Sequence, residues 1–469
     1  MPSHWTDLFF ARWVHAASRA LWDPVMLLLL TGTGVLLTLR TRFLPWRNLG
    51  YALRCALDRD ARRDRGGGIS PFAALMTTLA ATIGTGNIVG VATALAAGGP
   101  GALVWMELSA AFGMASKLAE CMLAVKYRTR SSTGEPAGGP MYVMRSALSP
   151  GLGRLLGFFF ALFTALAAFG IGNITQSHSI AEVLFSAAAV PRAASGLVVA
   201  LLTLLAVFGG IGSISRIASV LVPLMAAGYL AAGTLVILGN LSALPGAMAA
   251  MLQSAFSLPA AAGGCAGAAS AGLFRAAHYG IARGIFSNEA GMGSAAITAA
   301  AAAADHPVRQ GYLQMTAVFF DTMVICSVTG LAVCTSGVLD AAGSGGVPLS
   351  GAALTTAAFR SVLGPAGGGL VSACILLFAF STILGWEYQG ERAVEYLLGA
   401  APVRLYRVLF SAAALWGAVQ SLELVWDLSD LFNALMALPN LLCLLLLSGP
   451  TARELRRFQP EVLRQKRRP

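Results

Sequence analysis

The stretch Thr82-Ile83-Gly84-Thr85-Gly86-Asn87 decides the fold, because it interrupts a run of apolar residues that extends from about 71 to 97. A run of that length is enough for a helix to cross the hydrocarbon core of a bilayer. Glycine loosens a helix, and the side chain of Asn87 competes with the backbone for hydrogen bonds. Unwound backbone at membrane depth is tolerated only where it is buried in protein or lines a cavity. We therefore predict a membrane helix that is broken in its middle.

A second polar interruption, Gly284-Ile285-Phe286-Ser287-Asn288-Glu289-Ala290-Gly291-Met292-Gly293, lies inside the apolar run 272–303. The two interrupted runs are five spans apart, so they hold matching places in two units of five helices. Paired interruptions of this kind indicate the binding site of a transporter. The alternative is that these glycines only let helices pack closely, as small residues do in many membrane proteins.

The composition also requires a membrane protein. Of the 469 residues, 57% are hydrophobic and only 11% are charged, whereas soluble domains carry about 25% charged residues. Lipid offers backbone groups no hydrogen-bond partners, so the spanning segments are helices or a closed barrel. Nearly continuous apolar stretches such as 197–207 and 435–447 lack the alternation of a barrel, and this predicts helices.

We predict an all-α membrane protein with about eleven transmembrane helices. The predicted spans are residues 23–40, 71–97, 101–126, 155–186, 195–213, 217–238, 272–303, 309–336, 366–388, 403–420 and 426–448. The chain then divides into an N-terminal interfacial segment (1–22), a single domain (23–450) and a basic tail (451–469). Span 1 stands alone in this domain, and the two five-helix units cover about 71–238 and 272–448.

The charged residues predict the orientation. The net charge of +11 comes mainly from arginines, which are dense after spans 1 and 3 and beyond Arg453, whereas 239–272 carries no charged residue. Basic loops stay in the cytoplasm and meet anionic lipid headgroups. We therefore expect a bacterial inner-membrane protein with its N-terminus outside and its C-terminus inside, and we expect no nucleic-acid partner. The seven cysteines and five histidines show no spacing typical of a metal site.

A broken helix suits a zwitterion and a cation together. The N-terminus of a half-helix presents free N–H groups and a positive dipole end, which favour a carboxylate. The carbonyls freed at the adjoining C-terminal end suit a small hard cation such as sodium. An amino acid carried with sodium would use both kinds of helix end.

At these residues the chain resembles the alanine or glycine:cation symporters, also called sodium:alanine symporters, of the amino acid/polyamine/organocation superfamily. The matching motifs lie in order from about residue 30 to 450, so the resemblance covers nearly the whole chain. They are Ala80–Ala94, Ala97–Ala102, Gly138–Tyr142, Phe286–Gly291, Pro307–Gly311, Gly385–Tyr388 with Gly390 and Glu391, and Asp430–Asn440.

The resemblance implies a leucine-transporter-like fold. In that fold, five helices and an inverted copy of them enclose a site at the midplane, and one extra helix precedes them. It also implies a symporter that takes up a small neutral amino acid, alanine or glycine, with sodium by alternating access. No enzymatic cofactor is implied, and the oligomeric state is left open.

The resemblance further implies a set of site residues. The substrate would contact the first break, Gln176, the residues before the second break, and Trp386, which would limit the size of its side chain. The predicted substrate residues are Gly84, Thr85, Gly86, Asn87, Gln176, Ile285, Phe286, Ser287 and Trp386. Sodium would lie between the carbonyls around Thr82 and Ile83 and the hydroxyls of Ser381 and Thr382.

The sequence departs from the family pattern at two places. Gly293-Ser294-Ala295-Ala296-Ile297-Thr298 stands where the family usually has Pro and then His. Glu387 and Gln389 replace residues that are usually small and aromatic. A carboxylate beside Trp386 would alter the ion coupling or the pocket.

Four of the predicted site residues also allow a structural interpretation. Gln176 follows Asn173 and Thr175 in an apolar span, and such a polar group either binds ligand or joins helices. Ser381 and Thr382 could bond back to their own helix. Trp386 belongs either to an interfacial belt or to the pocket.

Charged residues inside spans are costly and are therefore functional candidates. Lys117 and Glu120 lie three residues apart on one helix face, and we interpret them as a structural pair. Asp321 and Glu289 are better candidates for function, and we expect Glu289 to brace the unwound segment.

Other functions stay open at this point. The chain could be a proton-coupled carrier of another small solute, which a measured sodium dependence would distinguish from the symporter. It could also be a sensor that binds an amino acid without moving it. An intramembrane enzyme would need convergent catalytic groups, which the five histidines do not suggest, so we predict that the protein is not an enzyme.

Overall fold

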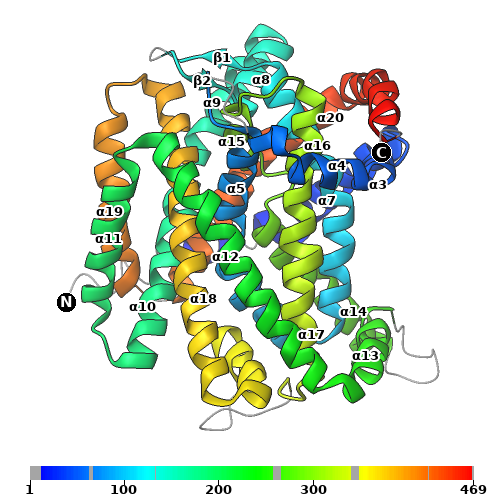
Figure 1. The fold of residues 1–469 in the computed structure, drawn as a ribbon, viewed down its shortest axis with the longest axis vertical. Helices are drawn as coiled ribbons and strands as arrows, with labels where there is room; N and C mark the ends of the chain where they lie inside the picture. Colours follow the sequence, from blue (N-terminus) through cyan, green and yellow to red (C-terminus); the bar gives the residue numbers. More distant parts are fainter. Residues whose placement is uncertain are drawn as a thin grey trace.

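The computed structural model describes residues 12–18, 20–62, 67–131, 134–256, 266–339, 348–420 and 422–466. Nearly all of this part is helical (Figure 1). The elements in chain order are η1 (Trp22–Met26), α2 (Leu27–Arg40), α3 (Leu44–Arg47), α4 (Leu49–Leu57), η2 (Arg59–Arg62), α5 (Pro71–Thr82), η3 (Gly86–Gly90), α6 (Val91–Gly98), α7 (Gly101–Lys126), β1 (Thr129–Arg130), β2 (Pro136–Ala137), α8 (Pro140–Ala147), α9 (Pro150–Ala167), η4 (Ala168–Ile174), α10 (Thr175–Ala188), α11 (Arg192–Val207), α12 (Gly210–Gly239), η5 (Leu241–Ala243), α13 (Leu244–Phe256), α14 (Ala266–Asn288), α15 (Ser294–Ala300), α16 (Pro307–Val318), η6 (Phe319–Cys326), α17 (Ser327–Thr335), α18 (Gly351–Leu398), α19 (Val403–Val419) and α20 (Leu422–Lys466).

Local sequence signals set the helix ends around the site. The Ser70 hydroxyl accepts a hydrogen bond from the backbone N–H of Ala73 at 3.1 Å, and Pro71 follows as the first residue of α5. This is a favourable helix start, because the hydroxyl satisfies a free donor and proline needs none. At the other end of the broken span, Gly99 has a φ of +73° and ends α6, a conformation that glycine adopts without strain.

The helices run mostly along one axis, which is vertical in Figure 1. α7 lies at the centre of one half of the molecule, where it packs against α14, α15 and α16. α18 packs against α5, α12 and η4 in the other half. The short antiparallel β1–β2 pair and α8 lie at one end of the molecule, and α13 lies at the opposite end (Figure 1).

The all-α fold class is confirmed, whereas the number of spans stays a prediction. Each of the eleven predicted spans falls mainly on helical residues. Within the described residues, six helices are long and apolar enough to cross a membrane, or seven if the bent pair Pro71–Thr82 and Gly86–Gly98 is one span. α2 has 14 residues and α11 has 16, so both are short for a spanning helix.

The structure differs from the predicted elements in three places. Part of the predicted connection 239–272 is the helix α13. The predicted span 366–388 belongs to α18, in which Gly364 has non-helical dihedral angles before Pro365. The helix α20 runs through the predicted boundary at 450 to Lys466. Residues 1–11, which include most of the predicted interfacial segment, lie outside the described residues.

The two breaks are present, but the second begins later than predicted. α5 and the η3–α6 segment are bent by 50° at the first break. The second break covers Glu289 to Gly293, where Glu289, Gly291 and Gly293 have positive φ angles. Gly284 is helical, and a β-carbon there would come within 3.0 Å of Met106 Cγ. Gly284 therefore serves close packing on α7 rather than the break.

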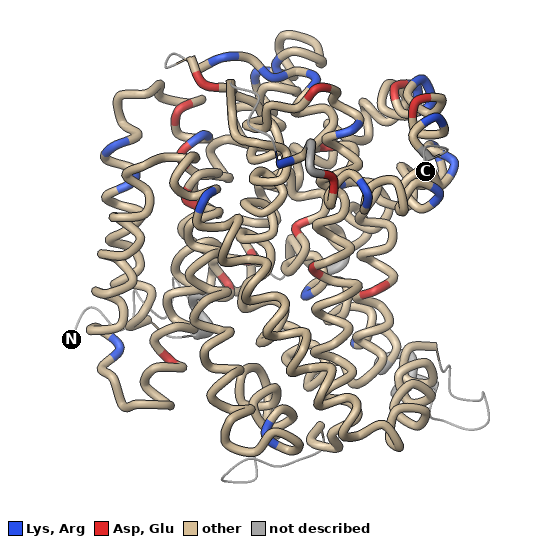
Figure 2. Tube along the Cα trace, viewed as in Figure 1, with Lys and Arg blue, Asp and Glu red and all other residues tan. Residues whose placement is uncertain are grey.

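The charged side chains are distributed unevenly along the molecule. Figure 2 shows most of the Lys and Arg residues at the end that carries β1, β2 and α8. The end that carries α13 has few of them (Figure 2). Some charged side chains are buried between the helices, and Lys117, Glu120 and Glu289 lie near the second break.

Candidate functional site

The first break is held open by a side chain of its own segment. α5 ends at Thr82, and Asn87 in η3 accepts a hydrogen bond from the Gly84 N–H at 2.9 Å through Oδ1. The Thr85 N–H donates to Gln176 Oε1 at 3.4 Å. Both acceptors are side-chain amide oxygens. Two backbone N–H groups of this break therefore point at oxygen atoms, as they would toward a bound carboxylate.

Gly84 lies where three elements meet. A β-carbon at Gly84 would come within 2.6 Å of Thr382 Oγ1 in α18 and within 3.4 Å of Gln176 Oε1 in α10. No side chain fits there without displacing the Thr382 hydroxyl. Gly84 is therefore needed because α10 and α18 leave no room for a side chain at the break. Its conformational freedom is not the main reason.

Gly86 connects the first broken helix to the second. A β-carbon at Gly86 would come within 3.2 Å of Ser287 Cα and 3.5 Å of Phe286 Cδ1. Phe286 and Ser287 are buried, with exposed fractions of 5% and 1%. The structure thus brings these predicted residues together across the two helices. Ile285 is also buried, and its carbonyl accepts the Glu289 N–H at 2.8 Å, as part of the end of α14.

Three of the predicted sodium ligands, Ile83, Ser381 and Thr382, lie close together, and the carbonyl of Ala80 lies beside them. Thr382 Oγ1 lies 3.1 Å from the carbonyl oxygen of Ala80 and 3.5 Å from that of Ile83. Ser381 Oγ lies 3.4 Å from the Ala80 oxygen. Both hydroxyls also lie within hydrogen-bond distance of Phe378 O in their own helix, at 2.8 and 3.0 Å, as the structural interpretation expects. The Thr82 hydroxyl bonds to Leu79 O at 3.5 Å. The sodium site stays a prediction.

Asp321 joins the two breaks and was not among the predicted site residues. It is fully buried in η6, where its Oδ1 accepts from Asn87 Nδ2 and its Oδ2 from Ser287 Oγ, both at 2.8 Å. Thr322 Oγ1 adds a third hydrogen bond at 2.9 Å. The rarity of a carboxylate inside a span singled out Asp321 in the sequence, but its partners depend on the tertiary structure.

Three segments of π-helix surround this region. Gly86 and Asn87 belong to η3, Gln176 follows η4, and Asp321 belongs to η6. π-helical turns are rare and often occur at functional sites, because they redirect side chains and loosen the backbone ladder. Their coincidence here supports a functional interpretation of the region over a purely structural one.

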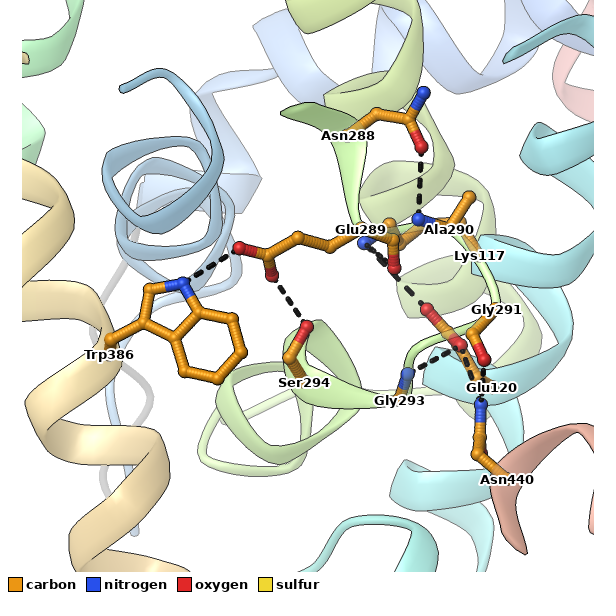
Figure 3. Close-up of polar contacts among 10 residues, drawn as sticks. All are labelled: Lys117, Glu120, Asn288, Glu289, Ala290, Gly291, Gly293, Ser294, Trp386 and Asn440. Atoms are coloured by element: carbon orange, nitrogen blue, oxygen red, sulfur yellow. Dashed lines mark hydrogen bonds and ion pairs between the residues drawn. The ribbon is translucent and has the colours of Figure 1, made fainter. Parts of the chain in front are cut away.

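Charged and polar groups brace the second break (Figure 3). Glu289 accepts hydrogen bonds from Trp386 Nε1 at 2.8 Å and from Ser294 Oγ at 2.5 Å. Lys117 Nζ donates to the Glu289 carbonyl at 3.1 Å and lies 3.7 Å from Glu120 Oε1. Glu289 therefore braces the unwound segment, as we expected.

Glu120 and Asn440 hold the rest of this segment. Glu120 Oε2 accepts from the Gly293 N–H and from Asn440 Nδ2, both at 3.1 Å. Asn440 also donates to the Gly291 carbonyl at 2.8 Å (Figure 3). Glu289, Gly291 and Gly293 are thus each bonded to a side chain from α7, α18 or α20.

Trp386 is an interior residue. Its side chain is fully buried, and a β-carbon at Gly172 in η4 would overlap it. This position excludes an interfacial belt. Trp386 lies against η4 on one side and bonds to Glu289 on the other, so it links α18 to the second break.

A cavity of about 630 Å³ opens beside the site. Val89 in η3, Thr93 in α6, Arg283 in α14 and Trp426 in α20 line part of it. The ring centroids of Trp426 and Phe286 are 4.8 Å apart. None of the predicted substrate residues lines this cavity, so the aromatic pair separates it from the breaks.

Comparisons with known proteins agree with this arrangement. The model of the sodium:alanine symporter family matches residues 7–469. A sodium/alanine symporter of Methanococcus maripaludis is 46% identical over 450 residues, which cover 96% of this chain and 97% of the relative. A probable sodium/glutamine symporter of Bacillus subtilis is 37% identical over 436 residues, with 93% and 88% covered.

A solved structure supports the fold. The transporter MhsT in complex with L-phenylalanine superposes with a TM-score of 0.59 over 85% of this chain and 98% of its own, at 15% sequence identity. The fold is therefore of the leucine-transporter type.

Proposed function

Because the chain belongs to the sodium:alanine symporter family, we propose that it takes up a small neutral amino acid, alanine or glycine, together with sodium. Family membership makes the protein a multi-pass membrane transporter rather than an enzyme, and it implies sodium as the coupling ion and an amino acid as the cargo. The choice of alanine or glycine and the residues that hold them are the proposal.

The observation that carries the proposal is the convergence of Gly84, Gly86, Gln176 and Ser287 at the first break. The amino acid carboxylate would replace the Gln176 oxygen at the Thr85 N–H, where the backbone already donates to an oxygen atom. Freed Gln176 would then be available to the ammonium group. Gly86 lies close to Ser287, because a β-carbon there would come within 3.2 Å of Ser287 Cα. The choice of alanine or glycine over a larger substrate rests on the family and on its sodium/alanine relative.

Sodium would bind in the oxygen cluster between α5 and α18. The carbonyls of Ala80 and Ile83 and the hydroxyls of Ser381 and Thr382 are hard, neutral oxygen ligands, which suit a cation of low charge. The cluster adjoins Gly84 through Thr382. A cation there would stabilise the unwound segment that holds the carboxylate, which supports coupling of the two cargoes.

We further propose that the end rich in Lys and Arg faces the cytoplasm. Positive residues are retained on that side of bacterial inner membranes, and Figure 2 gathers them at the end of β1, β2 and α8. The cavity of about 630 Å³ would then be part of the entry path, separated from the breaks by Phe286 and Trp426.

The test is uptake of labelled alanine and glycine into proteoliposomes under an inward sodium gradient, a proton gradient, or neither. We expect sodium-driven uptake of alanine or glycine that excess unlabelled glutamine does not inhibit. Uptake driven only by protons would contradict the coupling ion, and uptake of glutamine in preference would contradict the substrate.

A matched pair of variants locates the site. Gly86→Ala places a β-carbon 3.2 Å from the Ser287 backbone, whereas Gly90→Ala, in the same π-helix, meets nothing within 4 Å. Overpacking costs about 1–3 kcal/mol, so we expect Gly86→Ala to lower uptake by roughly tenfold and Gly90→Ala to leave it unchanged. Equal effects of the two would contradict a site at the first break.

A further inference from the structure

A carboxyl group without partners lies where α18 packs against α19 and η4. Glu387 is fully buried, and neither of its carboxyl oxygens has a hydrogen-bond partner among the described residues. An ionised carboxylate in such a place is strongly disfavoured, because nothing replaces its hydration. Burial without a hydrogen-bond partner favours the neutral, protonated form of a carboxyl.

A second unpartnered group lies on the same interface. Glu387, Gly390 and Glu391 share one face of α18, because they are three and four residues apart. A β-carbon at Gly390 would overlap the Tyr406 hydroxyl of α19, so this hydroxyl lies directly over the Gly390 backbone. The Tyr406 hydroxyl is buried and also lacks a hydrogen-bond partner within the described part of the chain.

Aromatic rings and an alanine border this pair on one side. The Tyr406 ring lies 5.4 Å from the Phe169 ring and 5.8 Å from the Phe410 ring. Ala168 of η4 adjoins Gly390. η4, with the sequence Ala168–Ile174, contributes no titratable side chain. The charged and titratable groups that face Glu387 are Glu391 and Arg392 from α18 and Tyr406 and Arg407 from α19.

A chain of ion pairs leads from this pair to the surface. Glu391, one turn from Glu387, accepts from Arg407 Nε at 2.7 Å and from Arg392 Nη2 at 2.5 Å. Arg392 also pairs with Glu395 at 2.8 Å and with Glu135 at 3.2 Å. The Glu135 side chain is 51% exposed. Charged side chains thus lead from the turn after Glu387 to the exposed Glu135.

On its other side, Glu387 adjoins the second break. The neighbouring residue Trp386 donates to Glu289 Oε1 at 2.8 Å and packs against Gly172 of η4. Trp386 and Glu387 are adjacent on one turn of α18, so a shift of that turn would move both the Glu387 carboxyl and the contact to the second break.

We propose that Glu387 is a proton-binding site of the transport cycle. The carboxyl holds its proton in this conformation and releases it to water when α18 shifts against α19. The remaining carboxylate is then stabilised by Arg407 and Arg392, and no other bond is made or broken. The inference rests on the proposed symport function, because that cycle supplies the second conformation.

Infrared spectroscopy of the protein in lipid tests the protonation without any transport. A protonated carboxyl has a carbonyl stretch that is distinct from the bands of a carboxylate. We expect Glu387→Gln to remove one carboxyl equivalent from that band. Glu391→Gln, which removes an ion-paired carboxylate one turn away, leaves it unchanged. A band that Glu387→Gln does not alter overturns the proposal, even in a preparation that transports nothing.

The pH profile of sodium-driven uptake tests the role in the cycle. The conformation with neutral Glu387 is favoured at low pH and loses population as the pH rises, so uptake by the unmodified protein varies with pH. Glu387→Gln fixes a neutral side chain, and we expect its uptake to be independent of pH. Glu107→Gln is the control, since Glu107 is another intramembrane carboxyl but is bonded to Ser327 at 2.9 Å.

A Glu387→Gln profile that matches that of the unmodified protein overturns the proposal. If this variant fails to fold, Tyr406→Phe takes its place, because it keeps the ring contacts and removes only the unpartnered hydroxyl. We expect Tyr406→Phe to shift both the carboxyl band and the pH profile, and no shift in either would also overturn the proposal. Absence of uptake in every protein, with the band still lost in Glu387→Gln, contradicts the proposed symport function and leaves the protonated carboxyl established.

Discussion

At the first break, the Thr382 hydroxyl and the missing side chain of Gly84 fit together. The Thr382 hydroxyl occupies the space into which a Gly84 side chain would project, and it faces the carbonyls of Ala80 and Ile83. The family resemblance implied the two hydroxyls and the carbonyls around Thr82 and Ile83 as sodium ligands, and this assignment stays a prediction. It did not single out Ala80, since every residue carries a carbonyl and only the tertiary structure decides which one faces α18.

Replacement of Thr382 by valine removes the hydroxyl and keeps the shape of the side chain. A hydrogen bond or ligand contact to a charged group contributes about 1.5–3 kcal/mol, so we expect the sodium concentration for half-maximal uptake to rise by roughly tenfold or more. Thr77→Val is the control, because Thr77 bonds to Ala73 O in its own helix at 2.8 Å. The measurement is uptake as a function of sodium concentration. If Thr382 had no part in sodium binding, the curves of Thr382→Val and the unmodified protein would coincide.

His306 makes stability depend on pH at the start of α16. Its Nδ1 accepts the Val308 N–H at 3.1 Å, and its ring stacks on Phe458 at 4.3 Å. Burial lowers the pKa of His306 from its usual 6.5. The unfolded chain therefore takes up a proton at a pH where the folded chain does not, and the free energy of unfolding falls as the pH drops below about 6.5.

His306→Asn keeps a capping acceptor without a titrating group. We expect its melting temperature in detergent to match that of the unmodified protein near neutral pH and to fall less on acidification. Thermal unfolding at several pH values gives the difference in melting temperature between the two proteins. The contributions of the other titrating groups cancel in this difference. Parallel curves would show that His306 does not titrate in this way.

At the scale of elements, the second break is rigid rather than loose. Glu289 and Glu120 accept hydrogen bonds from neighbouring helices, and Asn440 donates them, while Lys117 lies fully buried among them (Figure 3). A cluster of glycines suggested an unwound segment that starts at Gly284, but glycine also serves close packing. The positive φ angles of Gly291 and Gly293 mark the actual break, and nothing in the sequence separates these two uses of glycine.

Breaking the buried ion pair should destabilise this element. Glu120→Gln keeps an acceptor for the Gly293 N–H but leaves Lys117 without its opposite charge at 3.7 Å. Loss of one partner of a buried pair costs about 3–5 kcal/mol, so we expect a clear fall in melting temperature. Lys117→Met combined with Glu120→Gln removes both charges, and we expect it to recover part of the loss. A double variant less stable than the single one would contradict the pairing.

At the scale of the whole molecule, composition and charge were the most informative features of the sequence. The scarcity of charged residues predicted the helical membrane fold, because lipid leaves no other arrangement for such a chain. The clustering of arginines matches the uneven distribution in Figure 2. The number of spans does not follow in the same way, since α2 and α11 are short and α18 contains a break at Gly364.

The proposed orientation can be tested with single cysteines at the two ends. In a background without the seven native cysteines, Arg130→Cys in β1 and Ser242→Cys in η5 each place an exposed thiol in a short connecting segment. We expect a membrane-impermeant maleimide to label Ser242→Cys on intact cells and Arg130→Cys only after the membrane is opened. The reverse pattern would place the Arg-rich end outside.

The position of Asp321 has a consequence for the energy supply of the cell. One carboxyl group is bonded both to Asn87 of the first broken helix and to Ser287, which directly precedes the second break. In the proposed symport cycle, such a tie would keep the carrier from admitting sodium alone. Without it, sodium would leak inward with no nutrient gained, and the pumps that expel sodium would have to run continuously to restore the gradient.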